Sequence, residues 1–132
     1  MKRQASELVL EPLDPSFTVC RVKDYASVDL SRPFCFTGVT DEEQSLVCPT
    51  EEVPENTEAR EDGWRCFRIR GVLDFSLTGI LAGIAEILAD NEIGLFAVST
   101  FNTDYIFVKV EQFPQALSLL GQAGYNVMNG CR

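Results

Sequence analysis

An α+β fold, with its elements in the order β-α-β-β-α-β, is predicted for the second half of this 132-residue chain. Apolar residues recur at helical spacing over residues 80–90, and a second helical pattern follows Pro114. Between them, alternating residues over 95–100 and 106–110 predict two strands. Strand-like segments also precede the first helix and end the chain. This order is that of a ferredoxin-like fold.

Length, composition and charge bound the function. The chain is long enough for one core, or for two small halves that share a sheet, and its apolar content of 45% predicts a globular protein. Its net charge of −9 disfavours nucleic acid and anionic membrane as partners. No apolar run reaches membrane-spanning length, and there is no apolar secretory segment. We therefore expect a cytoplasmic protein.

The first half is predicted to be a weaker copy of the same order. A strand over residues 8–10 ends at Pro12, and a second strand spans 17–22. Residues 24–31 form a short helix or a crossover. Residues 34–48 are predicted to form a hairpin around the acidic turn 41–43. Residues 50–62 form a polar stretch that is a short helix or a linker. We expect two domains, 1–62 and 63–132.

The second half carries the stronger patterns. Residues 64–70 predict a strand that is buried on both faces. The first helix has an apolar face of Ile80, Ile84 and Ile87, and the second opens at Pro114 and ends at Gly124. A closing strand covers residues 125–127. A turn over 102–104 joins the two middle strands.

The loop before the first helix suggests a binding site. A helix N-terminus presents backbone N–H groups without intrahelical partners and a partial positive charge, so it suits a small carboxylate. The loop over residues 74–79 leads into such an end. Asp104, in the hairpin turn, has the opposite charge and suits an ammonium group. Together these two features could bracket a free amino acid.

The segment LDFSLTGILAGIAEILADNEIGLFAVSTFNTDYIFVK resembles an ACT domain. The resemblance is to the subgroup found in aspartate kinase regulatory regions, in small stand-alone ACT proteins and in cytosolic arginine sensors. It is strongest over Arg65 to Asn126, where the Asp-x-x-x-x-Gly loop and the STFNTDY hairpin have the family's spacing. It extends more weakly over the first half, where SLVCPTEEVPE is similar to the segment that links two ACT-like halves.

The resemblance implies a regulatory protein that binds an amino acid at a site formed by two modules. Its ligand loop would be Asp74, Phe75, Ser76, Leu77, Thr78 and Gly79, with backbone groups of Ser76 to Ile80 facing the carboxylate. Its second contact region would be Thr100, Phe101, Thr103 and Asp104. The neighbouring module would contribute the region of Val47 and Cys48. The first half has no second Asp-x-x-x-x-Gly loop, so two equivalent sites per chain are not implied.

Simpler roles remain open for the same residues. Asp74 and Thr78 are residue types that often cap helices, and Gly79 and Gly83 suit close helix–sheet packing. Asp104 is a common turn former. Cys48, which precedes Pro49, could be a reactive thiol, but no basic residue lies nearby in the sequence to lower its pKa.

Three classes of function are compared. An amino-acid-binding regulatory or sensor module is preferred, and the alternative is an oligomerising interaction module with a vestigial ligand pocket. A small enzyme such as an acyl phosphatase is disfavoured, because the 74–79 loop contains Asp and no Arg. The chain has no His and no CxxC pair, so no metal, cofactor or catalytic residue is expected. Unpaired sheet edges predict a homodimer, pairing of the two halves of one chain into a continuous sheet, or both.

Overall fold

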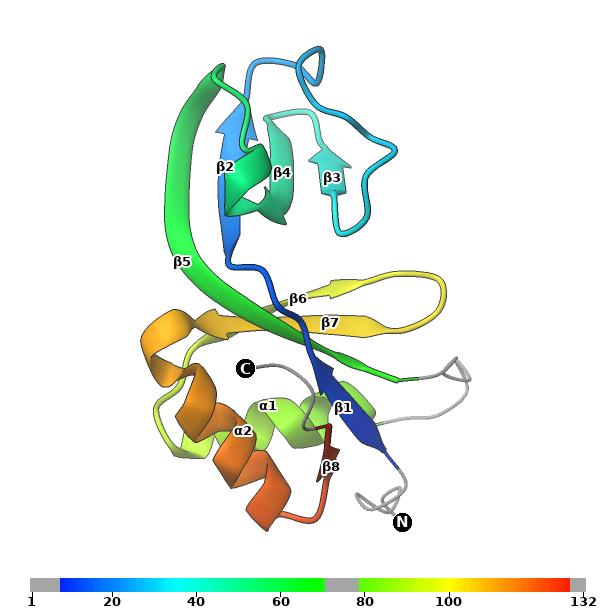
Figure 1. Cartoon of the computed structure of the whole chain (residues 1–132), viewed down its shortest axis with the longest axis vertical. Coiled ribbons are helices and arrows are strands. Elements are labelled where there is room, and N and C mark those ends of the chain that lie inside the picture. Colours follow the sequence, from blue (N-terminus) through cyan, green and yellow to red (C-terminus); the bar gives the residue numbers. More distant parts are fainter. Residues whose placement is uncertain (1–7, 71–78, 129–132) are drawn as a thin grey trace. The chain divides into compact units, whose positions relative to one another are not determined.

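The computed structural model describes residues 8–70 and 79–128, which form two compact units (Figure 1). Unit 2 is the continuous segment Pro15–Trp64, and unit 1 combines the residues before that segment with those after it. Strand β5, Thr57–Ile69, contributes its first part to unit 2 and its last part to unit 1. Within the described ranges, no helix is both long and apolar enough to cross a membrane.

Unit 1 has the predicted β-α-β-β-α-β order. After the end of β5 come a helix, a hairpin, a second helix and a short strand: α1 (Ile80–Asp90), β6 (Leu95–Ser99), β7 (Asp104–Lys109), η3 (Val110–Gln112), α2 (Phe113–Gln122) and β8 (Asn126–Val127). A Pro lies in the first turn of α2, and Gly124, with a φ of 108°, follows its end. Both predicted helices and the predicted hairpin are therefore confirmed.

An additional strand lies within the sheet of unit 1. β1 (Val9–Pro12) pairs antiparallel with β5, with Leu10 opposite Ile69, and parallel with β8, with Val9 opposite Asn126. On its other side β5 pairs with β7, which pairs with β6. The strand order is therefore β8-β1-β5-β7-β6.

The core of unit 1 lies between this sheet and the two helices, which cover the same face (Figure 1). Each helix buries one side because its apolar residues recur every three or four positions. The buried residues are Ile80, Ile84 and Leu88 from α1, Phe113, Ala116 and Leu120 from α2, and Leu10, Phe67, Ile69, Ile106 and Val108 from the sheet. A Cβ at Gly83 would lie 3.3 Å from the Tyr125 hydroxyl oxygen, so α1 approaches Tyr125 closely at this position.

Unit 2 repeats the strand order of unit 1 without its helices. Its strands are β2 (Phe17–Val22), β3 (Phe36–Val39), β4 (Gln44–Pro49) and the first part of β5. In unit 2 the first strand, β2, pairs with the third, β4, which pairs with the second, β3; in unit 1, β5, β7 and β6 pair in the same way. Within Pro15–Trp64, all of which is described, the only helical turn is η2 (Thr50–Glu52). The strand pairing of unit 2 agrees with the predicted weaker copy, and an origin of the two halves as a repeat stays a prediction.

The structure corrects one local prediction and decides between the two alternatives of another. The segment 57–62 was expected to be a short helix or linker, but it is the start of β5 and pairs with β2. Its side chains from Glu58 to Asp62 are exposed, so it lacks the apolar alternation that marks a half-buried strand. Residues 24–31 contain turns and irregular backbone and no helix, which favours the crossover. The domain boundaries 1–62 and 63–132 stay a prediction.

Candidate functional site

The turn between β6 and β7 is fixed by the side chain of Thr100. The backbone N–H of Thr100 donates to the Thr103 carbonyl oxygen at 2.9 Å. Its hydroxyl donates to the same oxygen at 3.1 Å and accepts the Thr103 N–H at 3.4 Å. The predicted turn therefore exists but lies one or two residues earlier, because Asp104 is already the first residue of β7.

Thr103 attaches this turn to the end of β5. Its side chain is 7% exposed, and its hydroxyl donates to the Ile69 carbonyl oxygen at 2.7 Å. Ile69 is the last residue of β5, where the chain leaves the sheet towards α1. A buried hydroxyl needs such a partner, since an unpaired one costs about 1–3 kcal/mol. The turn is therefore held beside the end of β5.

Asp104 lies on the helix-facing side of the sheet. It is opposite Ser99 in the β6–β7 ladder, and its Oδ1 accepts the Ser99 hydroxyl at 2.6 Å. Residues two apart on a strand share a face, and Ile106 belongs to the core beneath the helices. The Asp104 carboxylate is half-buried and has acceptor capacity beyond the one bond to Ser99. Its role is therefore not that of a turn residue bonded only to its own backbone.

The N-terminus of α1 has no side-chain cap from its N-cap residue, Gly79. Gly79 has a φ of 80°, a conformation that favours glycine, and its carbonyl oxygen accepts the Gly83 N–H at 2.9 Å. The Ile80 side chain is buried in the core, so only its backbone can face a ligand. Asp74, Phe75, Ser76, Leu77 and Thr78 lie outside the described residues, so neither their predicted ligand contacts nor the capping alternative is described.

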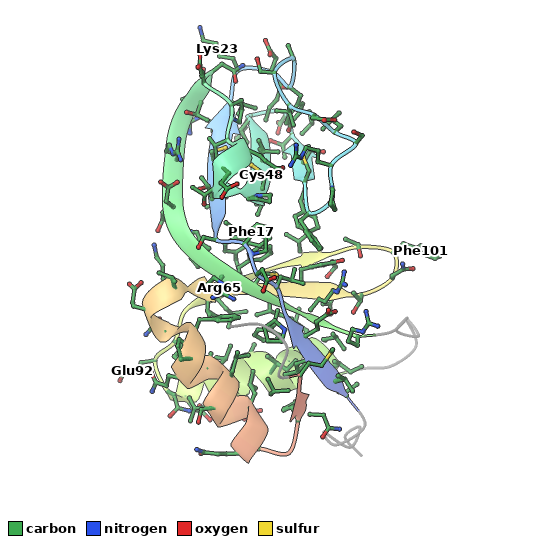
Figure 2. The ribbon with its side chains drawn as sticks, viewed as in Figure 1. Phe17, Lys23, Cys48, Arg65, Glu92 and Phe101 are labelled. Carbon is green, nitrogen blue, oxygen red and sulfur yellow. The ribbon has the colours of Figure 1, made fainter. Side chains whose placement is uncertain are left out.

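The remaining predicted residues differ in exposure. Phe101 is 81% exposed at the tip of the β6–β7 turn (Figure 2). Val47 and Cys48 belong to β4 of unit 2 and are buried there. Within unit 1, the structure joins Thr100 to Thr103 by hydrogen bonds, and Asp104 to Ser99 in the same hairpin.

Two contributors to this region were not predicted. Ser99 supplies the hydroxyl that orients Asp104, and the Ile69 carbonyl oxygen accepts the Thr103 hydroxyl. A four-residue turn of Ser99-x-x-x-x-Asp104 spacing places the two flanking side chains opposite each other, and that spacing is readable in the sequence. No comparable signal points to Ile69, because its contact is made by backbone.

A separate polar depression of about 400 Å³ lies in unit 2. Its lining combines cations and carboxylates: Arg21, Lys23, Asp41, Glu42, Glu43 and Glu58. Arg21 and Glu58 form an exposed ion pair at 3.4 Å, and the Lys23 carbonyl oxygen accepts the Gln44 side-chain amide at 3.0 Å. None of the residues predicted to bind a ligand lines it.

The described thiols are poor nucleophiles. Burial raises the pKa of Cys48 to about 12 and also raises the pKa values of Cys20 and Cys35. Because the thiolate is the reactive form, these pKa values disfavour a catalytic Cys48. Within the described ranges, no cluster of three His, Cys, Asp or Glu side chains is suited to hold a metal ion.

Solved structures share this fold. The chain superposes on a protein from Agobacterium tumefaciens with a TM-score of 0.82 and 29% identity, covering 95% of this chain and 93% of that one. A Vibrio cholerae protein of unknown function superposes with a TM-score of 0.72 and 23% identity, covering 92% of this chain and 93% of that one. The ligand-free regulatory subunit of aspartate kinase from Thermus thermophilus superposes with a TM-score of 0.63 and 13% identity, covering 91% of this chain and 99% of that one. A search of curated protein sequences finds no match.

The sequence comparison agrees with the fold. Residues 59–122 match the family model described as the ACT domain. The matched segment runs from within β5 to the last residue of α2, and so includes both helices and the hairpin. This part of the chain therefore matches the ACT domain, and unit 1, with its β-α-β-β-α-β order, is similar in fold to the regulatory domains of aspartate kinases.

Proposed function

We propose that this protein is a regulatory module that binds a free α-amino acid and has no catalytic activity of its own. The observation that carries the proposal is the hydrogen bond from Thr103 to the Ile69 carbonyl oxygen. It holds the turn that precedes Asp104 beside the end of β5, the strand that comes before α1 in the chain. In this proposal, the N-terminus of α1 binds the ligand carboxylate, and the Asp104 carboxylate binds the ligand ammonium group.

The chemistry of the two groups fits an amino acid better than a phosphate ester or a simple anion. Asp104 is held by Ser99 through one carboxylate oxygen, which leaves acceptor sites for an ammonium group. A phosphate would be repelled by this carboxylate and would find no arginine in the predicted 74–79 loop. In this proposal the loop from Asp74 to Gly79 binds the ligand carboxylate through its backbone.

A thermal-shift screen of the common amino acids tests the proposal. A ligand that binds only the native state stabilises it by about 2.7 kcal/mol at one hundred times its Kd. For a chain of this size we expect a rise in Tm of roughly 5–15 °C with the correct amino acid.

The matched controls are the N-acetyl and carboxamide forms of each amino acid that stabilises the protein. Each removes one of the two charges, so both should lose most of the shift. The proposal fails if no amino acid raises the Tm, or if the N-acetyl forms raise it equally.

The second candidate is an interaction module whose ligand pocket is vestigial, and the sheet edge in unit 1 favours it. Within the described residues β6 pairs only with β7, so its outer edge carries backbone groups that another chain can pair with. The strand has the sequence Leu-Phe-Ala-Val-Ser, which contains no Lys and no Pro to prevent such pairing. The two candidates are compatible, since a regulatory module can also assemble.

We therefore predict a homodimer formed through β6. Light scattering after gel filtration should give twice the mass of one chain at micromolar concentration. Ala97→Lys places a charge on an exposed position of β6 and should yield a monomer, whereas Ala82→Lys, on an exposed position of α1, should remain dimeric. A wild-type monomer at all concentrations, or an unaffected Ala97→Lys dimer, would reject this interface.

A further inference from the structure

Three thiols lie in one apolar cluster inside unit 2. Cys20, on β2, and Cys48, on β4, are buried in this cluster, and Cys35 packs against it from the segment that enters β3. Cys48 is labelled in Figure 2, in the interior of the unit. The strand of Cys48, β4, pairs with β2 on one side and with β3 on the other. The site proposed for an amino acid uses none of the three as a reacting group.

Strand register determines which two thiols can be joined. The antiparallel β3–β4 ladder ends with Phe36 opposite Val47, and Cys35 and Cys48 are the residues that would continue this register by one position on each side. Directly opposed Cα atoms lie about 4.5–5.5 Å apart, within the roughly 4.4–6.8 Å that a disulfide spans. On the other side of β4, Thr18 is opposite Cys48, so Cys20 is a diagonal neighbour, at roughly 7–8 Å. The register therefore favours Cys35 with Cys48.

Cys35 is also the most exposed of the three thiols. It is partly exposed, whereas Cys48 is 1% exposed. The residue before it, Phe34, has a φ of 63° and packs its ring edge-on against Phe17, with ring centroids 6.4 Å apart. This contact anchors the chain immediately before Cys35. We propose that Cys35 and Cys48 form a reversible disulfide with a small-molecule disulfide as oxidant, and that the bond ties β3 to β4.

The exchange has two balanced steps. The Cys35 thiol gives its proton to solvent, and its sulfur attacks the small disulfide, R–S–S–R; one R–S⁻ leaves and takes up a proton. Cys48 then gives up its proton, and its sulfur attacks the Cys35 sulfur and displaces the second R–S⁻, which is protonated to a thiol. Two protein thiols are oxidised, and one small disulfide is reduced to two thiols.

The environment of the thiols makes this a slow response. Burial raises the pKa values of both Cys35 and Cys48, so little thiolate is present near neutral pH. Brief exposure to an oxidant therefore leaves the thiols reduced, and sustained exposure closes the bond. The bond would constrain β3, which pairs only with β4 within the described residues and whose last three residues are exposed.

The experiment uses the full chain in a Cys131→Ser background, because Cys131 lies outside the described residues. The reduced protein is incubated with oxidised glutathione at about pH 8.5, where thiolate fractions are larger, until the thiol count stops changing. Free thiols are then alkylated and peptides mapped by mass spectrometry. We expect the loss of two thiols, a peptide linking Cys35 to Cys48, and a rise in Tm of several degrees that dithiothreitol reverses.

Matched variants separate this bond from other oxidation. Cys35→Ser, at a partly exposed position, should retain the fold and form no linked peptide, and Cys20→Ser should still form the Cys35–Cys48 link. Cys66→Ser, in unit 1, should also keep the link. The inference is overturned by a link that involves Cys20, by a persistent glutathione adduct on Cys35, or by retention of all thiols at the end point.

Discussion

Phe67→Ala is expected to destabilise the folded chain by about 3–5 kcal/mol. Phe67 is fully buried on β5, in the core between the sheet and the helices, and its ring centroid lies 6.4 Å from that of Phe113. Removing the ring leaves a cavity that close-packed neighbours fill only in part. Natural domains have roughly 5–15 kcal/mol of stability, so urea denaturation should show a large fall in the midpoint.

The matched control is Phe101→Ala, which removes the same ring from a position that is 81% exposed. Its effect on stability should lie within about 0.5 kcal/mol. Similar losses for both variants would mean that Phe67 does not contribute to the core as described.

Asp104→Asn is expected to weaken amino acid binding by about ten- to a hundredfold, which corresponds to roughly 1.5–3 kcal/mol. The substitution removes the charge that would pair with the ligand ammonium group but keeps the shape. Its Oδ1 can still accept the Ser99 hydroxyl, so the Tm without ligand should stay close to that of the wild type. Titration calorimetry with the amino acid identified by the thermal-shift screen measures the loss.

Asp90→Asn provides the control for a general change in charge. Asp90 is an exposed carboxylate at the last residue of α1, in the same unit as Asp104. Its variant should bind with unchanged affinity. If Asp104→Asn also binds normally, Asp104 is not part of the site, and the proposal rests on the helix N-terminus alone.

Local periodicity was sufficient to predict the elements of unit 1 from α1 to β8, but not the pairing of β1 with this sheet. The buried positions Ile80, Ile84 and Leu88 lie on one face of α1, and this spacing alone defines an amphipathic helix. The start of β5 could not be predicted in this way. Its exposed residues, such as Glu58 and Arg60, resemble a linker, and it is a strand because its backbone pairs with β2. Pairing with a distant strand leaves no pattern in the segment itself.

The candidate site was predicted only in part for the same reason. Thr100 and Asp104 lie in one short hairpin, so their spacing in the sequence is enough to predict that they are close in space. The bond from Thr103 to Ile69 joins residues more than thirty positions apart, so only the tertiary structure reveals it. The proposed contacts of the 74–79 loop, Val47 and Cys48 with a ligand stay predictions, as does the cytoplasmic location.

The position of β1 between β5 and β8 determines when each unit can fold during synthesis. Unit 2 is one continuous segment, so all of its strands are available once residues up to Trp64 have been made. In unit 1, Val9 pairs with Asn126, almost the full length of the chain away. Domains generally fold as units while the chain emerges from the ribosome, and pairing between distant segments is slow. Unit 2 can therefore fold during translation, whereas the sheet of unit 1 stays incomplete until Asn126 and Val127 have been made, although β1 can pair with β5 earlier.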